Sequence, residues 1–462
     1  MNRSKKLCVL LGVFTVACIA TFAVTRMEER KEQIREAGET ILELPAESVQ
    51  TLSWTYEDNT LSFHRDEAWL YDEDEDFPVS EEKIRELLAQ FQSLGAAFII
   101  EDVEDFGQYG LDDPICTIKL SAEDQDYEVK LGDYSKMDAQ RYVSIGDGNV
   151  YLVNHDPLDE YGAVLSDMID HDETPSFDHV TQVQFAGNET YSITYQEDSA
   201  DTYSDDDIYF AQQNGKALPL DTSKVENYLQ SITNLDPTDY VTYNVTEEEL
   251  ETYGLDKPAL TVTVDFTAEA EDGGEIADSF VLHISPDPEA AGGTQDGEEA
   301  EVPAYVRVGE SQIVYQIPAS SYKKLAAASC NDLRHSEVFW ADFADVQQLD
   351  VTLEGSSYTF TPAEAGDGDT WLYEGTEFDV VDLRAELKAL LAEEFTDAQP
   401  TQQEEISLTV HLDDENFPQV RITLYRYDGE HCLAVVDGES VSLVERSAAV
   451  ALIEAVHAIV LD

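Results

Sequence analysis

The sequence predicts an α+β protein made of tandem repeated units, in which antiparallel sheets pack with helices, preceded by one N-terminal transmembrane helix. Three observations indicate this architecture: a hexapeptide that occurs twice, segments in which apolar and polar residues alternate, and one long uncharged apolar run near the start. The chain has 462 residues, of which 42% are hydrophobic, so it is long enough for about three domains with cores of their own.

The apolar run covers residues 7–24 and is expected to form the transmembrane helix. A helix of this length spans about 27 Å, close to the roughly 30 Å hydrocarbon core of a bilayer. Basic residues precede the run, so the positive-inside rule places residues 1–6 in the cytoplasm and the bulk of the chain outside the cell membrane. Residues 25–47 are expected to form a helical juxtamembrane stalk.

Two other interpretations of the apolar run stay open. Thr21-Phe22-Ala23 resembles the small-x-small site of a cleaved signal peptide, although the run is longer than most signal peptides have. Cys18 weakly resembles a lipoprotein processing site, but apolar residues follow it where a lipoprotein turns polar. All three interpretations export the bulk of the chain.

The composition is strongly acidic, with 98 Asp and Glu against 26 Lys and Arg and a formal net charge of −72. Such a chain repels polyanions, so nucleic-acid binding is excluded and lying flat on an anionic bilayer is disfavoured. The acidity is also compatible with solubility in a salty or crowded milieu, without any partner being implied.

Self-comparison divides the exported part into three repeats: residues 48–175, residues 176–340 and a degenerate copy at 341–462. The hexapeptide Tyr109-Gly110-Leu111-Asp112-Asp113-Pro114 recurs as Tyr253-Gly254-Leu255-Asp256-Lys257-Pro258, and the third copy lacks it. One helix is expected in each copy, at residues 80–94, 221–233 and 381–393.

Alternating segments such as 260–266, 406–412 and 420–424 predict antiparallel strands with one face packed beneath a helix and one face solvated. In the second repeat, residues 285–303 are rich in Gly, Pro, Ala and Glu. We expect them to form an exposed, disordered hairpin loop.

Turn chemistry explains the hexapeptide without a ligand. Thr246 and Glu249 form a capping box that starts a short helix, and Gly254 ends it in a left-handed conformation. Leu255 supplies the accompanying apolar contact, and Pro258 prevents the helix from restarting. The first copy is expected to use Asp102, Gly110, Leu111 and Pro114 in the same way, while a ligand role for the Asp of the motif remains the alternative.

The cysteines outside the apolar run are Cys116, Cys330 and Cys432. Their wide spacing and apolar surroundings predict three small buried hydrophobic side chains, with one disulfide and one free thiol as the alternative.

The sequence contains no assignable reactive or metal-binding constellation. Asp72, Asp74 and Asp76 have the early spacing of a calcium loop, but Phe77 and Lys83 occupy positions that need Gly and Glu. Histidines 155 and 171 lack a second His or Cys at zinc-site spacing, and histidines 283 and 411 are expected on solvated strand faces. We therefore assign no catalytic, cofactor-binding or metal residues and expect a non-enzymatic protein.

Trp69-Leu70-Tyr71, Phe77-Pro78-Val79 and the two hexapeptides resemble the bacterial family called domain of unknown function 4340. The resemblance covers residues 48–340 well and the last 120 residues weakly. It implies a membrane helix followed by tandem extracytoplasmic units. It also implies an accessory role beside ABC transporters related to gliding-motility systems, and it carries no catalytic residues onto this chain.

We therefore expect a membrane-anchored, extracytoplasmic, non-enzymatic scaffold or accessory protein of a cell-envelope complex, with an ABC transporter or other envelope protein as partner. The alternative is an extracellular carbohydrate-binding or hydrolytic protein that uses carboxylates in a groove between repeats.

Overall fold

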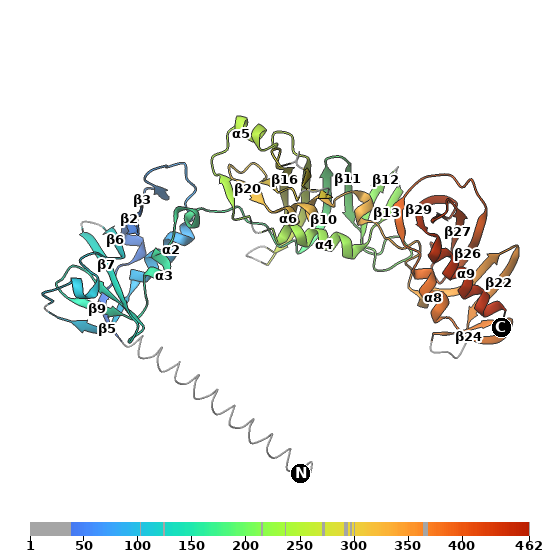
Figure 1. Ribbon diagram of the computed structural model, residues 1–462, viewed down its shortest axis with the longest axis horizontal. Coiled ribbons are helices and arrows are strands. Elements are labelled where there is room, and N and C mark those ends of the chain that lie inside the picture. Colours follow the sequence, from blue (N-terminus) through green and yellow to red (C-terminus); the bar gives the residue numbers. More distant parts are fainter. Residues whose placement is uncertain are drawn as a thin grey trace, which may run out of the picture. The chain divides into compact units, whose positions relative to one another are not determined.

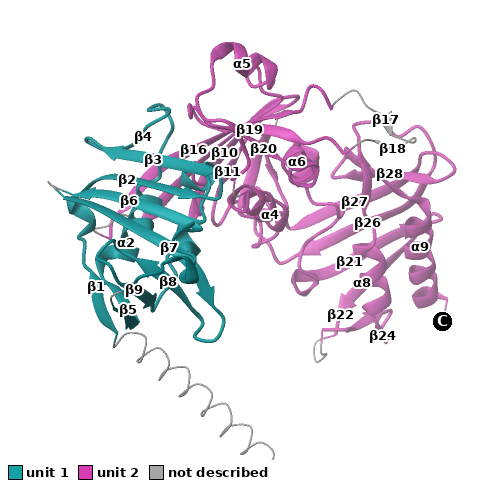
Figure 2. Cartoon of the chain, turned by 60° about the vertical axis from the view of Figure 1, so that its left-hand side comes forward, with its two compact units in different colours: residues 1–171 teal, residues 172–462 magenta. Residues whose placement is uncertain are grey.

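The computed structural model describes residues 38–461, apart from 102, 123–124, 214–215, 236, 270–272, 291–293, 296–297, 300 and 364–367. The predicted transmembrane helix at 7–24 therefore lies outside the described residues. No helix in the described part is long and apolar enough to cross a membrane. The chain divides into two compact units, residues 1–171 and 172–462, shown in different colours in Figure 2.

The first unit contains a nine-stranded sheet of order β1-β5-β9-β8-β7-β6-β2-β3-β4, in which every pairing is antiparallel. Its strands are β1 (Glu39–Leu42), β2 (Val49–Tyr56), β3 (Asn59–Arg65), β4 (Trp69–Tyr71), β5 (Leu94–Ile100), β6 (Cys116–Ala122), β7 (Gln125–Ser135), β8 (Gln140–Ser144) and β9 (Val150–Val153). Its helices are α2 (Glu81–Gln92) and α3 (Leu158–Tyr161), with short 3₁₀ turns at η1 (Ala46–Ser48), η2 (Gly107–Tyr109) and η3 (Leu165–Met168).

The second unit contains two further nine-stranded sheets (Figure 1). The second sheet of the chain has the order β13-β12-β11-β10-β15-β16-β19-β20-β14. Its strands are β10 (His179–Ala186), β11 (Thr190–Tyr195), β12 (Tyr209–Gln213), β13 (Lys216–Pro219), β14 (Tyr240–Thr242), β15 (Leu260–Glu269), β16 (Glu275–Pro286), β19 (Ala304–Val308) and β20 (Val314–Ile317). The associated helices are α4 (Thr222–Thr233), α5 (Glu247–Thr252), α6 (Ala319–Ala326) and α7 (Cys330–Leu333).

The third sheet has the order β24-β23-β22-β21-β26-β27-β28-β29-β25. Its strands are β21 (Val346–Leu353), β22 (Ser356–Pro362), β23 (Thr370–Tyr373), β24 (Thr376–Asp379), β25 (Ala392–Phe395), β26 (Glu404–Leu412), β27 (Gln419–Arg426), β28 (His431–Val436) and β29 (Glu439–Glu445). The 3₁₀ turn η4 (Phe343–Asp345) precedes it, and α8 (Val381–Lys388) and α9 (Arg446–Val460) belong to it.

The three sheets share one topology. The second and third have matching strand orders, and the first has the same order over eight strands, with β1 added at the edge beside β5. The equivalent central pairs β2–β6, β10–β15 and β21–β26 even share a register irregularity near the start of the first strand. The predicted α+β class with tandem antiparallel units is confirmed, and the degenerate third copy has kept the fold.

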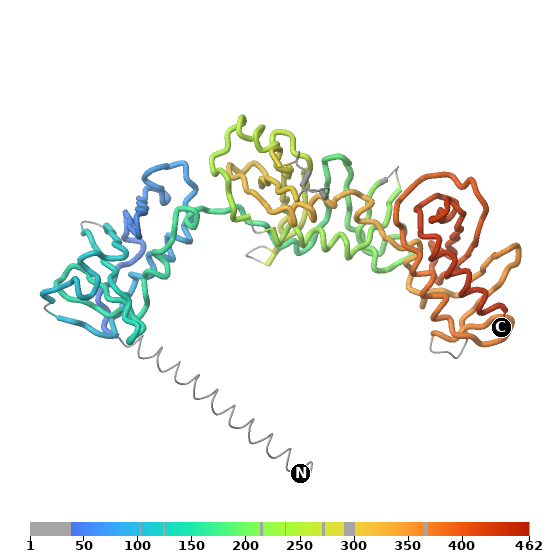
Figure 3. Tube along the Cα trace, in the orientation of Figure 1, coloured from blue at the N-terminus to red at the C-terminus, as the bar shows by residue number. Residues whose placement is uncertain are grey.

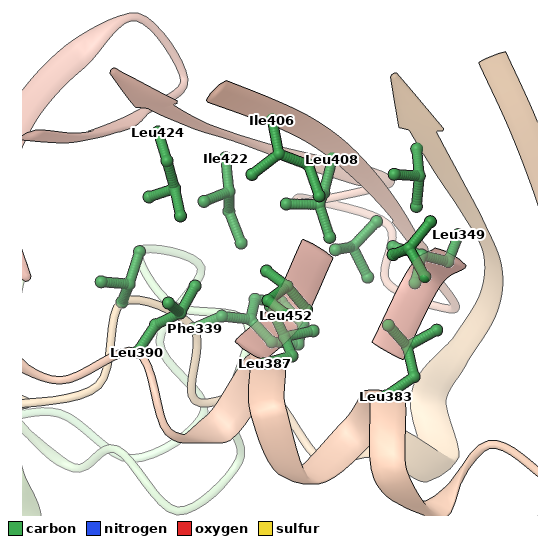
Figure 4. Packing of buried hydrophobic residues seen from close by; sticks show 14 of the residues in the cluster. Phe339, Leu349, Leu383, Leu387, Leu390, Ile406, Leu408, Ile422, Leu424 and Leu452 are labelled. Atoms are coloured by element: carbon green, nitrogen blue, oxygen red, sulfur yellow. The ribbon is translucent and has the colours of Figure 1, made fainter. Parts of the chain in front are cut away.

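Alternation along the strands builds the core as predicted. In β26, Ile406, Leu408 and Val410 are fully buried, while the residues between them are only partly buried. Figure 4 shows how side chains from these strands meet those of the covering helices, including Leu387 of α8 and Leu452 of α9. Burial of an aliphatic side chain contributes about 1.5–3 kcal/mol, so this single packed face stabilises the sheet.

Two predicted helical segments are wrong at their ends. Residues 25–37 of the predicted stalk lie outside the described residues, but its last part is not a helix: Glu39–Leu42 form β1, which pairs with β5, and Leu44 is buried with its backbone N–H donating to Phe91 O. The helix predicted over 381–393 ends at Lys388, because Leu390 is buried and Ala392 enters β25. In both places the segment pairs with the edge strand of a sheet. The helix propensity of the segment is weak compared with the stabilisation that this pairing supplies.

The hexapeptide forms a clamp on the sheet. In the second repeat the predicted Thr246–Glu249 capping box is present, Gly254 has φ 69°, and Leu255 is buried beside Val314 of β20. Tyr253 packs on Tyr305 of β19 with ring centroids 4.8 Å apart.

The first repeat has the same clamp, but a shorter helical turn precedes its glycine. Tyr109 packs on Tyr142 of β8 at 4.9 Å, Gly110 has φ 72°, and Leu111 is buried. The helix here is the 3₁₀ turn η2 and its first N–H is bound by Asp105, while the predicted cap, Asp102, lies outside the described residues.

The third repeat replaces the clamp by a second small core. Leu433, Val435 and Leu443 are buried on β28 and β29, with Ala398 and Tyr425 packed against them. The connecting segment that carries Ala398 covers the face that a hexapeptide covers in the other copies, so the motif could be lost without exposing the sheet.

The predicted loop at 285–303 is a hairpin connection, since β16 and β19 pair antiparallel as far as Pro286 and Ala304. It begins later than predicted: Ser285 is buried and its hydroxyl donates to Gly254 O at 2.7 Å. Within the loop, β17 (Thr294–Gln295) and β18 (Glu298–Glu299) form a short pair.

The clamp predicts a local effect of Leu255→Ala. Removing this buried side chain should destabilise the clamp by about 2–5 kcal/mol, because it leaves a cavity between α5 and the sheet. Hydrogen exchange should therefore speed up in residues 245–258 and in β19 and β20. The matched control is Ile276→Ala, at an exposed position of β16; unchanged exchange around residue 255 would contradict the clamp.

Candidate functional site

The acidic run of the first repeat is engaged in local turn contacts. Asp72 Oδ1 lies 2.6 Å from His64 Nδ1, and Asp74 Oδ1 accepts a hydrogen bond from the Asp76 N–H at 3.1 Å. This geometry is typical of an Asx turn. Among the described residues, these three belong to no group of side chains that could hold a metal ion.

The two strand histidines differ from the prediction that they are merely solvated. His283 Nδ1 lies 3.0 Å from Thr261 Oγ1, and burial together with the nearby Arg307 lowers the pKa of His283. His411 Nε2 lies 2.8 Å from Asp350 Oδ2. Burial raises the pKa of Asp350, but hydrogen bonds from Thr359, His411 and Gln348 outweigh it and leave the pKa lowered. Cross-strand partners, which a single strand pattern does not show, explain both cases.

The three cysteines are free and buried, as predicted. Burial raises the pKa of the Cys116 thiol to about 12 and that of Cys432 to about 11, and it also raises the pKa of Cys330. Since the thiolate is the reactive form, these side chains are packed as inert hydrophobic groups.

A buried polar network lies where the second sheet passes into the third. Asp207, whose side chain is 1% exposed, accepts hydrogen bonds from Thr202 Oγ1 at 2.5 Å and Trp340 Nε1 at 3.0 Å. Its other oxygen lies 2.8 Å from His335 Nε2. The rings of His335 and Trp340 stack with centroids 4.4 Å apart and 6° between planes.

The linker that carries His335 is tied to both sheets, and Figure 3 traces its path from α7 into the third repeat. On the side of the second repeat, the Asp221 N–H donates to Leu333 O, and Lys224 Nζ donates to Arg334 O and to Ser336 Oγ, both at 2.7 Å. On the side of the third repeat, Ser336 O accepts from the Ala392 N–H. We call this region, residues 333–340 with its contacts, the joint.

The joint contains the one group of side chains in the described part of the chain that could hold a metal ion. Asp221, His335 and Glu337 place a ligand atom each within 4.8 Å of one another. Sequence reasoning missed this group because Asp221 lies far from the other two along the chain. The only available signal was the N-cap position of Asp221, which indicates a helix start and not a ligand.

A groove of about 590 Å³ lies in the second repeat, between α4 and the sheet. Aromatic rings and carboxylates both line it, and the rings of His179 and Tyr195 meet edge to face at 4.8 Å. The lining residues that carry rings or carboxylates are Phe177, Asp178, His179, Tyr195, Tyr209 and Glu226.

Asp207→Asn tests the role of the joint. An amide keeps only one acceptor oxygen, so its NH₂ group must face either the Thr202 and Trp340 donors or the Nε2–H of His335, and we expect a loss of about 2–4 kcal/mol in the unfolding free energy of the region. Urea unfolding followed by tryptophan fluorescence measures it. The neighbouring exposed Asp206→Asn is the matched control; equal effects of the two changes would show that the network adds no stability.

The comparisons with known proteins add one match. A family model described as domain of unknown function 4340 matches residues 69–258 and again residues 211–411. The two matches begin in the equivalent strands β4 and β12, and each runs on into the next repeat. The comparison with curated proteins found no match. Because the matches together cover most of the chain and fall on successive repeats, the chain belongs to the family of domain of unknown function 4340.

Proposed function

We propose that the chain is a membrane-anchored, extracytoplasmic, non-enzymatic scaffold or accessory protein of a cell-envelope complex, with an ABC transporter as the first partner to test. The apolar run at 7–24 supports the anchor and the orientation. The tandem repeats support a display role, since repeated folds present successive surfaces to a partner.

One observation carries the non-enzymatic part of the proposal: the most deeply buried charged groups hold structural elements together. Arg141 Nε contacts both oxygens of Asp156 at 2.6 and 2.8 Å, and its guanidinium also donates to Gly132 O at 2.7 Å. In the joint, Asp207 likewise contacts Thr202, His335 and Trp340. Such contacts stabilise the geometry of the fold, and the side chains of Arg141 and Asp207 are both buried away from solvent.

The groove of the second repeat favours a second candidate function, carbohydrate binding. Flat rings beside carboxylates suit a sugar, because a ring face covers its C–H surface while carboxylates accept hydrogen bonds from its hydroxyls. The groove lies within one repeat, whereas the carboxylate groove expected from the sequence lies between repeats.

The scaffold role predicts a membrane partner. Affinity purification of the tagged full chain from detergent extracts should recover a transporter subunit in stoichiometric amount, while an unrelated single-pass protein with the same tag should not. Recovery of no membrane protein in several detergents, together with cosedimentation of the chain with insoluble cell-wall polysaccharide, would favour the second candidate instead.

The proposed topology predicts labelling from outside the cell. Met137 is 90% exposed in the turn between β7 and β8, so Met137→Cys should react with a membrane-impermeant maleimide in intact cells. The control is the parent chain, in which Cys8 and Cys18 are replaced by Ser and the remaining thiols are buried. Labelling that requires cell lysis would refute the extracytoplasmic location.

A further inference from the structure

We propose that Asp221, His335 and Glu337 form a binding site for one divalent cation of the zinc type, which fastens the linker of the joint to the start of α4. The site is independent of the scaffold role, since it concerns how two repeats of this chain are held together. Three lines of geometry and charge support it.

The first is the ligand set. One imidazole nitrogen and two carboxylate oxygens suit Zn²⁺, which binds such donors at about 2.0–2.2 Å and often leaves its fourth position to water. The three candidate ligand atoms lie within 4.8 Å of one another. Tetrahedral binding would bring them to about 3.3 Å, a movement that rotations of the Asp and Glu side chains can supply.

The second is the orientation of the imidazole. Asp207 Oδ1 lies 2.8 Å from His335 Nε2, while the other Asp207 oxygen accepts from Thr202 and Trp340, so we assign the Nε2–H of His335 as the donor to Asp207. The lone pair is then on Nδ1, which becomes the ligand atom. Stacking on Trp340 fixes the plane of the ring. A carboxylate on the far nitrogen is the usual outer-shell partner of a metal-binding histidine.

The third is charge. Asp207, Asp221 and Glu337 bring three carboxylates into a partly buried region in which Lys224 is the ammonium bound to the linker. The three carboxylates outnumber this ammonium, so negative charges remain in a group whose candidate ligands are each partly buried. One divalent cation would neutralise them, and Lys224 would remain on Arg334 O and Ser336 Oγ.

Binding would have a mechanical consequence. Asp221 is the N-cap of α4 in the second repeat, whereas the linker residues at 336–338 exchange backbone contacts with Leu390 and Ala392 of the third. The cation would therefore bridge α4 of the second repeat and the linker that is bound to the third. It would oppose separation of the linker from α4.

The test is metal titration of the purified full chain in detergent, with its tag removed. The titration is carried out in high salt and excess Mg²⁺, so that weak cation binding by exposed carboxylates does not contribute to the signal. Calorimetry with Zn²⁺ should show one tight equivalent, and Co²⁺ should give the visible absorption of tetrahedral coordination. Zn²⁺ should also raise the melting temperature and slow hydrogen exchange in residues 333–338.

Glu337→Gln and Asp221→Asn should each weaken Zn²⁺ binding by about tenfold or more, because each removes a ligand charge. Asn still caps a helix, so Asp221→Asn keeps α4 intact and decides the matter if Glu337→Gln does not fold. The control is Glu377→Gln, an exposed carboxylate of β24. Unchanged affinity in the folded ligand variants, or a loss as large in the control, would overturn the proposal. Neither result depends on finding a membrane partner.

Discussion

Each sheet of this protein depends on one antiparallel pair between strands that are distant in the sequence. In all three repeats a first meander of short strands and a second meander meet only at that central pair: β2–β6, β10–β15 or β21–β26. A slip of one residue there would turn every apolar side chain of the strand toward water. The shared register irregularity at the start of each pair shows that the same solution is used three times.

The hexapeptide follows from this constraint. The chain that leaves the covering helix must return to the central strand, and the clamp makes that return while its Tyr and Leu cover the otherwise solvated face near β8 or β19. Glycine is needed where φ is positive, since a side chain there would be strained. The third repeat shows that covering the face is the essential requirement, because Leu433 and its neighbours do so without the motif.

The second unit adds a problem that one repeat alone does not have, namely joining two sheets through a short linker. The joint solves it with buried hydrogen bonds and aromatic stacking around Asp207. These contacts use charged side chains structurally, and they also assemble the one metal-capable group of the described residues. In the proposed scaffold role such a connection would matter, because binding to several repeats at once depends on how they are held together.

The sequence by itself determined the α+β class, the antiparallel strands, the presence of repeats and the turn chemistry of Gly254, because these depend on neighbours within a few residues. It also indicated the buried state of Cys116, Cys330 and Cys432. Only the tertiary structure decided that the segment before Leu44 is an edge strand, that His411 meets Asp350, and that Asp221 meets His335. Those contacts join residues far apart in the chain, and their energy comes from pairing and burial that no local pattern records.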